Sequence, residues 1–274
     1  MLIGCHTSIR ESVSKAPKRA SDSGCEVMQI FSRPPQGGKG AEITPELQKE
    51  FRSECKKNNI KEIYIHTPYY INLASNNNRI RYGSIKAIRD ELERASLLGA
   101  RYVVTHIGSS KEVGEKEGVK ISSEMLTKCL EGYKGKARLL LENSAGAGSI
   151  IGDKFRELEE IISNVKNPGI AGICLDTQHS FASGYDWSDF RKTLQKIDQE
   201  IGLDKIKLLH LNDSLSDCGS NVDRHAHIGK GKIAQDSFLQ LTRFAEEKKI
   251  NAIVETKDPG VKDDIILLRQ LRTQ

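Results

Sequence analysis

Side chains able to bind metal ions stand at the ends of six short apolar segments of this chain. The segments read YIHTP, VVTHIG, LLLEN, ICLDTQH, LLHLND and IVETK, and a further cluster, VDRHAH, follows the fifth. Together they supply five histidines and four carboxylates: His66, His106, Glu142, Asp176, His179, His210, Asp223, His225 and Glu255. Nitrogen and oxygen donors without sulfur suit Zn²⁺ or Mn²⁺ and exclude an iron–sulfur centre.

Three of the carboxylates directly follow apolar residues, so we expect them to be buried. Glu142 follows three leucines, Asp176 follows Ile-Cys-Leu, and Glu255 follows Ile-Val. A buried carboxylate is costly unless a positive group meets it. The strand ends themselves offer histidines and no lysine or arginine. Metal ions would satisfy carboxylates and neutral imidazoles together, and nine ligands favour two or three ions over one tetrahedral ion.

A single histidine in this pattern does not by itself indicate a metal ligand. His66 or His106 alone fits a hydrogen-bonded core or loop histidine as well as a ligand, so the prediction depends on the recurrence along the chain. His6 ends the first strand-like segment and could support the ligands from behind. His227, in HAHIGKG, is expected to be a loop residue.

The elements that must position these residues alternate along the chain. Eight β-rich segments are predicted at Leu2–Cys5, Val27–Phe31, Ile63–His66, Tyr102–His106, Leu139–Glu142, Ile173–Asp176, Ile206–Leu211 and Ala252–Thr256. Helical periodicity lies between them, for example over Pro45–Lys57, Ile85–Leu98, Phe155–Ser163, Trp187–Ile201 and Ser237–Lys248. Near-continuous apolar strands alternating with helices indicate a parallel sheet covered by helices. Gly24, Gly99 and Gly202 stand where left-handed helix caps are expected.

The length fits one closed barrel. At 274 residues, with no Pro/Ser-rich linker, the chain is predicted to be a single (β/α)₈ TIM-barrel domain over residues 1–274. An open doubly wound sheet is the main alternative. In barrel enzymes the C-terminal ends of the strands surround the mouth, which is where all six strand-end candidates fall. The sequence therefore predicts a metal site at that mouth.

Composition restricts the partner and the compartment. The formal net charge of +5 permits a nucleic-acid partner without requiring one. No apolar run approaches the ~20 residues of a membrane helix. The start, MLIGCHTS, resembles a strand rather than a signal peptide, and the six cysteines form no CxxC pair. We expect a cytoplasmic protein in a reducing compartment, without membrane contact.

Five motifs in order resemble one known family. They are HTPYYINLAS (66–75), THIGS (105–109), LLENSAGAGSIIG (140–152), GICLDTQHSFASGYD (172–186) and LHLNDS…GSNVDRHAHIGKG (209–231). The chain resembles endonuclease IV, the second family of apurinic/apyrimidinic endonucleases, along nearly its whole length. The resemblance implies a zinc-dependent hydrolase of base excision repair that cuts duplex DNA 5′ to an abasic site. The cut would leave a 3′-hydroxyl, and removal of 3′-blocking groups is also expected.

The same resemblance divides the ligands among three zinc ions per chain, with Mn²⁺ as a conceivable substitute. His66 and His106 would hold one ion with Glu142, which bridges to the second. Asp176, His210 and Glu255 would complete that second site, and the third would use the remaining ligands, which are His179, Asp223 and His225. Glu142 would hold the nucleophilic water, and Glu255 could also accept a proton. A monomer is expected.

Residues that would contact DNA are less well defined by the motifs. Tyr69 resembles the family tyrosine that inserts at the lesion, where its ring could fill the space of the missing base. Phosphate contacts could come from Arg33, Lys230 and Lys232. Arg224 lies between two ligands in DRH and could support them.

The chain also departs from the family pattern. Leu215, Gln178, Ile107 and Lys230 replace a usual lysine, cysteine, proline and glutamate, none of them a ligand position. The loop SRPPQGG (32–38) lacks the asparagine and aromatic residue that help family members probe DNA. The DNA-reading residues of this loop therefore cannot be transferred from the family.

Two other functions are open at this point. A sugar isomerase or epimerase could use a related metal-binding barrel, although such enzymes use fewer ligands and lack the DRH pair. A non-catalytic DNA-binding or metal-storing barrel is the other alternative, against which the complete ligand set argues.

Overall fold

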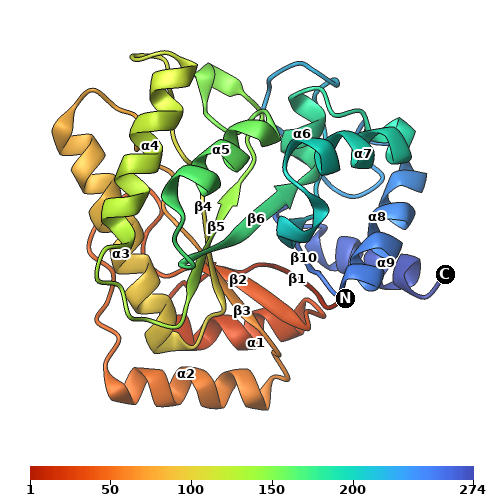
Figure 1. Cartoon of the computed structure of the whole chain (residues 1–274). Helices are drawn as coiled ribbons and strands as arrows, with labels where there is room; N and C mark the ends of the chain where they lie inside the picture. Colours follow the sequence, from red (N-terminus) through yellow and green to blue (C-terminus); the bar gives the residue numbers. More distant parts are fainter.

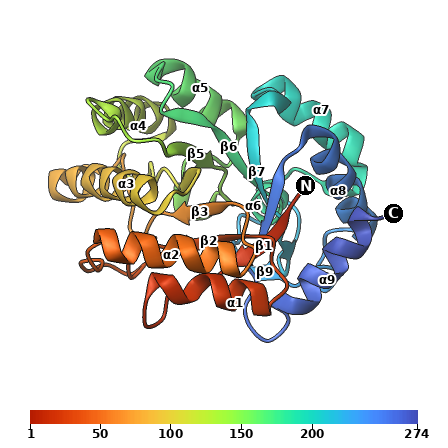
Figure 2. The ribbon, with the colours of Figure 1, turned by 90° about the horizontal axis from the view of Figure 1, so that it is seen from below.

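Eight parallel strands close into a barrel in the computed structural model, which describes residues 1–274. Their order around the barrel is β1-β10-β7-β6-β5-β4-β3-β2, and Figure 2 views it with the helices arranged around it. The strands are β1 (Ile3–His6), β2 (Val27–Phe31), β3 (Ile63–His66), β4 (Tyr102–Thr105), β5 (Arg138–Glu142), β6 (Ile170–Asp176), β7 (Ile206–His210) and β10 (Asn251–Val254). The predicted TIM barrel is confirmed. The pairing of β1 with β10 closes the sheet and excludes the open doubly wound alternative.

Helices cover the outside of the barrel (Figure 1). They are α1 (Ala16–Asp22), α2 (Pro45–Lys57), α3 (Asn78–Leu98), α4 (Glu115–Leu130), α5 (Phe155–Val165), α6 (Thr177–Ala182), α7 (Phe190–Glu200), α8 (Gln235–Lys248) and α9 (Val261–Arg272). None of them combines the length and the apolar character that crossing a bilayer would require. A two-stranded hairpin outside the barrel, β8 (Asp213–Ser214) with β9 (His225–Ala226), was not predicted. The VDRHAH segment (222–227) includes β9 and the end of the loop before it.

Local sequence signals set the ends of the helices. Thr44 caps α2 through its side chain, which accepts a hydrogen bond from the Leu47 amide, and Pro45 takes the first position of the helix. Asn77 caps α3 in the same way, so that helix begins seven residues before the predicted start. Gly99 ends α3 with φ of 82°, as expected for a left-handed cap.

The two faces of the strands bury different sets of side chains. Alternate residues point outward and pack beneath the helices, in the larger of two apolar clusters. The inward residues form a second, smaller cluster that includes Leu140, Leu208 and Ile253. Two positions further along the chain stand Glu142 and His210, the last residues of their strands, and Glu255, the first residue after β10. Because side chains alternate with a period of two, these polar residues form the next inward layer of the barrel, above an apolar floor.

Candidate metal centre

The nine predicted ligands gather at the C-terminal ends of the strands. Three groups have ligand atoms within 4.8 Å of one another. They are His66, His106 and Glu142; Glu142, Asp176, His210 and Glu255; and Asp176, His179 and His225. Glu142 belongs to the first and second groups, and Asp176 to the second and third. This sharing is the arrangement that bridging carboxylates in a multinuclear centre would need.

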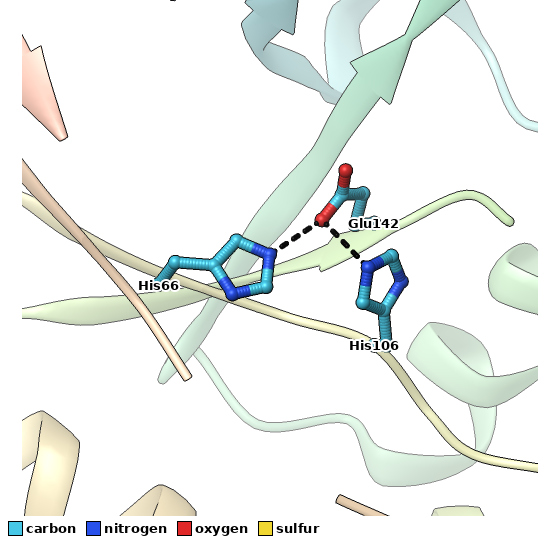
Figure 3. A group of neighbouring side chains, drawn as sticks. All are labelled: His66, His106 and Glu142. Atoms are coloured by element: carbon cyan, nitrogen blue, oxygen red, sulfur yellow. Dashed lines mark hydrogen bonds and ion pairs between the residues drawn. The ribbon is translucent and has the colours of Figure 1, made fainter. Parts of the chain in front are cut away.

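The first group comes from three neighbouring strands or strand ends, β3, β4 and β5. One oxygen of Glu142, Oε2, lies 2.9 Å from Nε2 of His66 and 3.4 Å from Nε2 of His106 (Figure 3). The carboxylate of Glu142 is fully buried, and the ring of His66 is 4% exposed. His106 is 29% exposed and forms the solvent side of the group.

The second group uses the other oxygen of Glu142. Oε1 lies 2.9 Å from Nδ1 of His210, a ring that is fully buried at the end of β7. The same nitrogen lies 3.2 Å from Oε2 of Glu255 and 3.9 Å from Oδ2 of Asp176. Three carboxylates therefore converge on one imidazole nitrogen.

The third group lies at the edge of the mouth. Asp176 caps the short helix α6 by accepting a hydrogen bond of 2.7 Å from the amide of His179, which places that ring one turn beyond the strand. Asp223, on the loop before β9, lies 3.6 Å from Nε2 of His179 and 3.6 Å from Nε2 of His225. The side chain of Asp223 is 55% exposed, so this group faces solvent more than the other two do.

Neighbouring carbonyl oxygens determine which ring nitrogen of His66 and of His179 carries the hydrogen. Nδ1 of His66 lies 2.7 Å from the carbonyl of Thr67, and Nδ1 of His179 lies 3.0 Å from the carbonyl of Asn143. A carbonyl only accepts, so each Nδ1 carries the hydrogen and each Nε2 presents a lone pair to the carboxylates. Nε2 of His225 is buried without any hydrogen-bond partner. A nitrogen lone pair and a carboxylate oxygen repel each other unless a cation lies between them. Their arrangement here therefore fits a bound cation.

The pKa values reflect the same concentration of charge. Burial alone would raise the pKa of Glu142, but the surrounding histidines lower it more strongly, to well below its usual value. Burial would lower the pKa of His179, yet Asp176, Asp223 and Glu142 raise it to about 10. The electrostatic potential of these carboxylates therefore strongly favours a positive charge at the mouth of the barrel. A divalent cation can supply that charge with more ligand bonds than a protonated ring can.

A cavity of 530 Å³ opens above the three groups. Its walls include His6, Phe31, Tyr69, Ser144, Thr256 and Lys257 in addition to six of the predicted ligands. The ring of Tyr69 is 66% exposed and packs edge-on against Phe31, 5.1 Å between centroids. Lys257 was missed from the sequence, although its position two residues after Glu255, in the segment that follows β10, could have indicated it.

The other predicted DNA-contacting residues lie apart from this cavity. Arg33 is buried, and its guanidinium pairs with the buried Glu91 of α3 and lies 3.6 Å from Asp90. Arg224 lines an adjoining cavity together with His227 and Lys257. Lys230 and Lys232 are exposed on the loop after β9, and Lys232 pairs with Asp217 at 2.6 Å.

Comparison with known proteins identifies the family. A family described as xylose isomerase-like TIM barrel matches residues 17–271. A probable endonuclease 4 of Natranaerobius thermophilus is 39% identical over 99% of this chain and 97% of its own length. A second, from Cenarchaeum symbiosum, is 37% identical over 97% and 96%.

Solved structures agree with this assignment. Endonuclease IV from Thermus thermophilus superposes with a TM-score of 0.86 and 31% identity over 100% of this chain and 98% of that one. A D-tagatose 3-epimerase-like protein shares the fold with a TM-score of 0.75, at 23% identity over 99% and 97%. That identity shows a common barrel and no more. The full-length similarity to the endonucleases shows that this chain belongs to the endonuclease IV family.

Proposed function

We propose that this protein is a zinc-dependent endonuclease that hydrolyses the phosphodiester bond 5′ to an abasic site in duplex DNA. The reaction leaves a 3′-hydroxyl, and the same site removes 3′-blocking groups. The observation that carries the proposal is the bridging position of Glu142, whose two oxygens face His66 and His210 at 2.9 Å each. One buried carboxylate thereby joins two adjacent ligand groups.

Nine side chains would hold three ions. His66, His106 and Glu142 form the first site; Glu142, Asp176, His210 and Glu255 form the second; the third uses His179, His225 and Asp223, with Asp176 also in reach. Ions of this kind lower the pKa of bound water towards ~7 and neutralise charge on phosphate oxygens and on the leaving alkoxide. Zn²⁺ suits the mixed imidazole and carboxylate donors, and Mn²⁺ could replace it.

Two glutamates have catalytic roles in this proposal. Glu142 is fully buried beneath the cavity and would hold the two ions whose sites it joins, which would supply the attacking water. Glu255 lines the cavity, and its side chain is 15% exposed, so a substrate can reach it. Its carboxylate can accept the proton that the water gives up.

The cavity wall explains the choice of an abasic nucleotide. The exposed ring of Tyr69 stands at the rim, supported by Phe31 from behind. An aromatic ring can stack on DNA bases, and it would occupy the space that the missing base leaves. An abasic sugar has no base to unstack, which lowers the cost of turning it into the cavity. Lys257 and Arg224, beside the ligands, can contact the phosphates that flank the lesion.

Arg33 has another role in this chain. Its pairing with Glu91 and the bonds from Arg94 to Ser32 anchor the SRPPQGG loop to α3, and a further bond from Arg94 holds Ala41, which follows the loop. The amide of Tyr69 in turn donates to the carbonyl of Pro35 at 3.2 Å. We propose that Arg33 supports the tyrosine through this loop and does not read DNA itself.

We further propose that the whole chain, residues 1–274, works as one domain and as a monomer in the cytoplasm. All six cysteines are free, and five of them are buried, in keeping with a reducing compartment.

The test uses end-labelled duplexes that differ only in one abasic site. We expect the purified protein to cut the abasic strand on its 5′ side and to leave an end that a polymerase can extend. A chelator should abolish the cut, and the intact duplex should survive. Isomerisation of free ketohexoses without any incision would refute the nuclease function and favour the epimerase alternative.

A further inference from the structure

An uncharged amide lies inside the layer of predicted ligands. Gln29, on β2, is fully buried and points into the barrel in the inward row that begins with Val27. Its Nε2 lies 2.6 Å from Oε1 of Glu255 and 3.0 Å from Nδ1 of His6. Its Oε1 lies 2.9 Å from Nε2 of His210. All the polar atoms of this side chain are therefore in contact with the metal centre or its wall.

These contacts allow one orientation of the amide. An ionised carboxylate only accepts hydrogen bonds, so the NH₂ group of Gln29 must face Glu255. The amide oxygen then faces Nε2 of His210, which must carry the hydrogen in order to donate. Nδ1 of His210 is left with its lone pair, and it points at Oε1 of Glu142 and Oε2 of Glu255, 2.9 and 3.2 Å away.

We propose that Gln29 is a positioning residue for the second ion site, the one formed by Glu142, Asp176, His210 and Glu255. It selects the ring nitrogen with which His210 binds, and it holds Oε1 of Glu255 so that Oε2 faces the ion. This inference rests on the metal centre proposed above and adds a residue that touches neither the ion nor the DNA.

The amide is the main support of both ligands. Nε2 of His210 bonds to the amide oxygen, and the thiol of Cys174 is the other side chain beside this ring apart from the carboxylates. Oε1 of Glu255 has His6, at 3.6 Å, as its other polar neighbour. Without the amide, the ring of His210 could turn and Glu255 could rotate away. Outer-shell partners of this kind typically change metal affinity by ~10–100-fold. The loss should be confined to one ion, because Gln29 contacts no ligand that belongs only to the first or third site.

The experiment compares Gln29→Met with the wild-type holoprotein. Methionine keeps the length and volume of glutamine but removes both hydrogen-bonding groups. Zinc is competed away with a chromophoric chelator, and the ions released per chain are counted against chelator concentration. We expect one ion to be released at ~10–100-fold lower chelator concentration than in the wild type, with the others unchanged. Excess zinc should restore much of the incision activity.

Gln178→Met is the matched control. Gln178 is also a fully buried glutamine, but its amide bonds to Ser214, Ser216 and the carbonyl of Val222. Its loss should leave the second ion as tightly bound as in the wild type. If Gln29→Met fails to fold, Gln29→Asn keeps a buried amide but withdraws it from both ligands, and it should weaken the same single ion.

The outcomes separate this inference from the proposed function. A wild-type protein that binds no ion and cuts no abasic duplex refutes the function. A wild-type protein that binds its ions and cuts, with all ions retained equally in Gln29→Met or Gln29→Asn, refutes only the role of Gln29. Equal weakening of every ion, or the same loss in Gln178→Met, would also refute it by making the effect a general one of packing.

Discussion

Replacing Glu142 by glutamine tests the bridging carboxylate. The change keeps the volume of the side chain and removes one negative charge that two ion sites share. Each oxygen has a 2.9 Å contact with a histidine, and the carboxylate is fully buried. Removing one partner of a buried charge pair costs about 3–5 kcal/mol, and the charge removed here is the one that both ion sites would share. At ~1.4 kcal/mol for each tenfold change in rate, incision should fall by at least ~10³-fold.

The assay for Glu142→Gln is single-turnover cleavage of an abasic duplex, with the metal content of the same sample measured by elemental analysis. The fold should persist, because the apolar cluster between strands and helices does not include Glu142. Glu157→Gln is the matched control, since Glu157 is a buried carboxylate that lies outside the cavity, bonded to the amide of Gly152 at 2.6 Å. A Glu142→Gln protein that keeps more than a tenth of the wild-type rate would show that this carboxylate is structural and not part of the bridging site.

Three further predictions use other parts of the molecule. Tyr69→Ala should keep all bound metal but weaken abasic-duplex binding, measured by fluorescence anisotropy, by ~1–2 kcal/mol; Tyr82→Ala, at an exposed tyrosine on α3, should not. Arg33→Ala should lower the free energy of unfolding in urea by about 3–5 kcal/mol, because it removes the ion-pair partner of the buried Glu91; an unchanged stability would contradict the anchoring role. Burial, followed by the nearby Asp153, raises the pKa of Glu157 from 4.5 to about 7. The folded state therefore binds the extra proton between these values, and the stability that Glu157 contributes is lost as pH rises through 7. Glu157→Gln should gain stability relative to the wild type between pH 5 and pH 8, and a constant difference in unfolding free energy across that range would contradict this assignment.

Short apolar runs that each end in a metal-capable side chain explain why the strands and the residues at their ends could be predicted. In β5 and β7 an apolar inward residue precedes the ligand by two positions, as Leu140 precedes Glu142 and Leu208 precedes His210. All eight barrel strands were therefore placed to within three residues, and the ligands fell at one end of the barrel.

The contacts that could not be predicted join residues far apart in the chain. Gln29 is an amide in mid-strand, and its contact with Glu255 spans 226 positions of the sequence. Arg33 was predicted as a possible phosphate contact, and its ion pair with Glu91, 58 positions later on α3, could not be predicted from the sequence. Such pairs depend on how a loop packs against a helix, which local periodicity does not encode. The β8–β9 hairpin is two residues per strand and leaves no periodic pattern to detect.

Stepwise return of zinc to chelator-treated protein tests the central claim most directly. Incision of an abasic duplex would be measured at each ratio of zinc to protein, beside the amount of zinc bound. Three connected groups of ligands predict that activity is absent at the start and reaches its plateau when about three ions are bound per chain. Full activity in the stripped protein, or a plateau at one ion, would contradict a multinuclear centre built on Glu142.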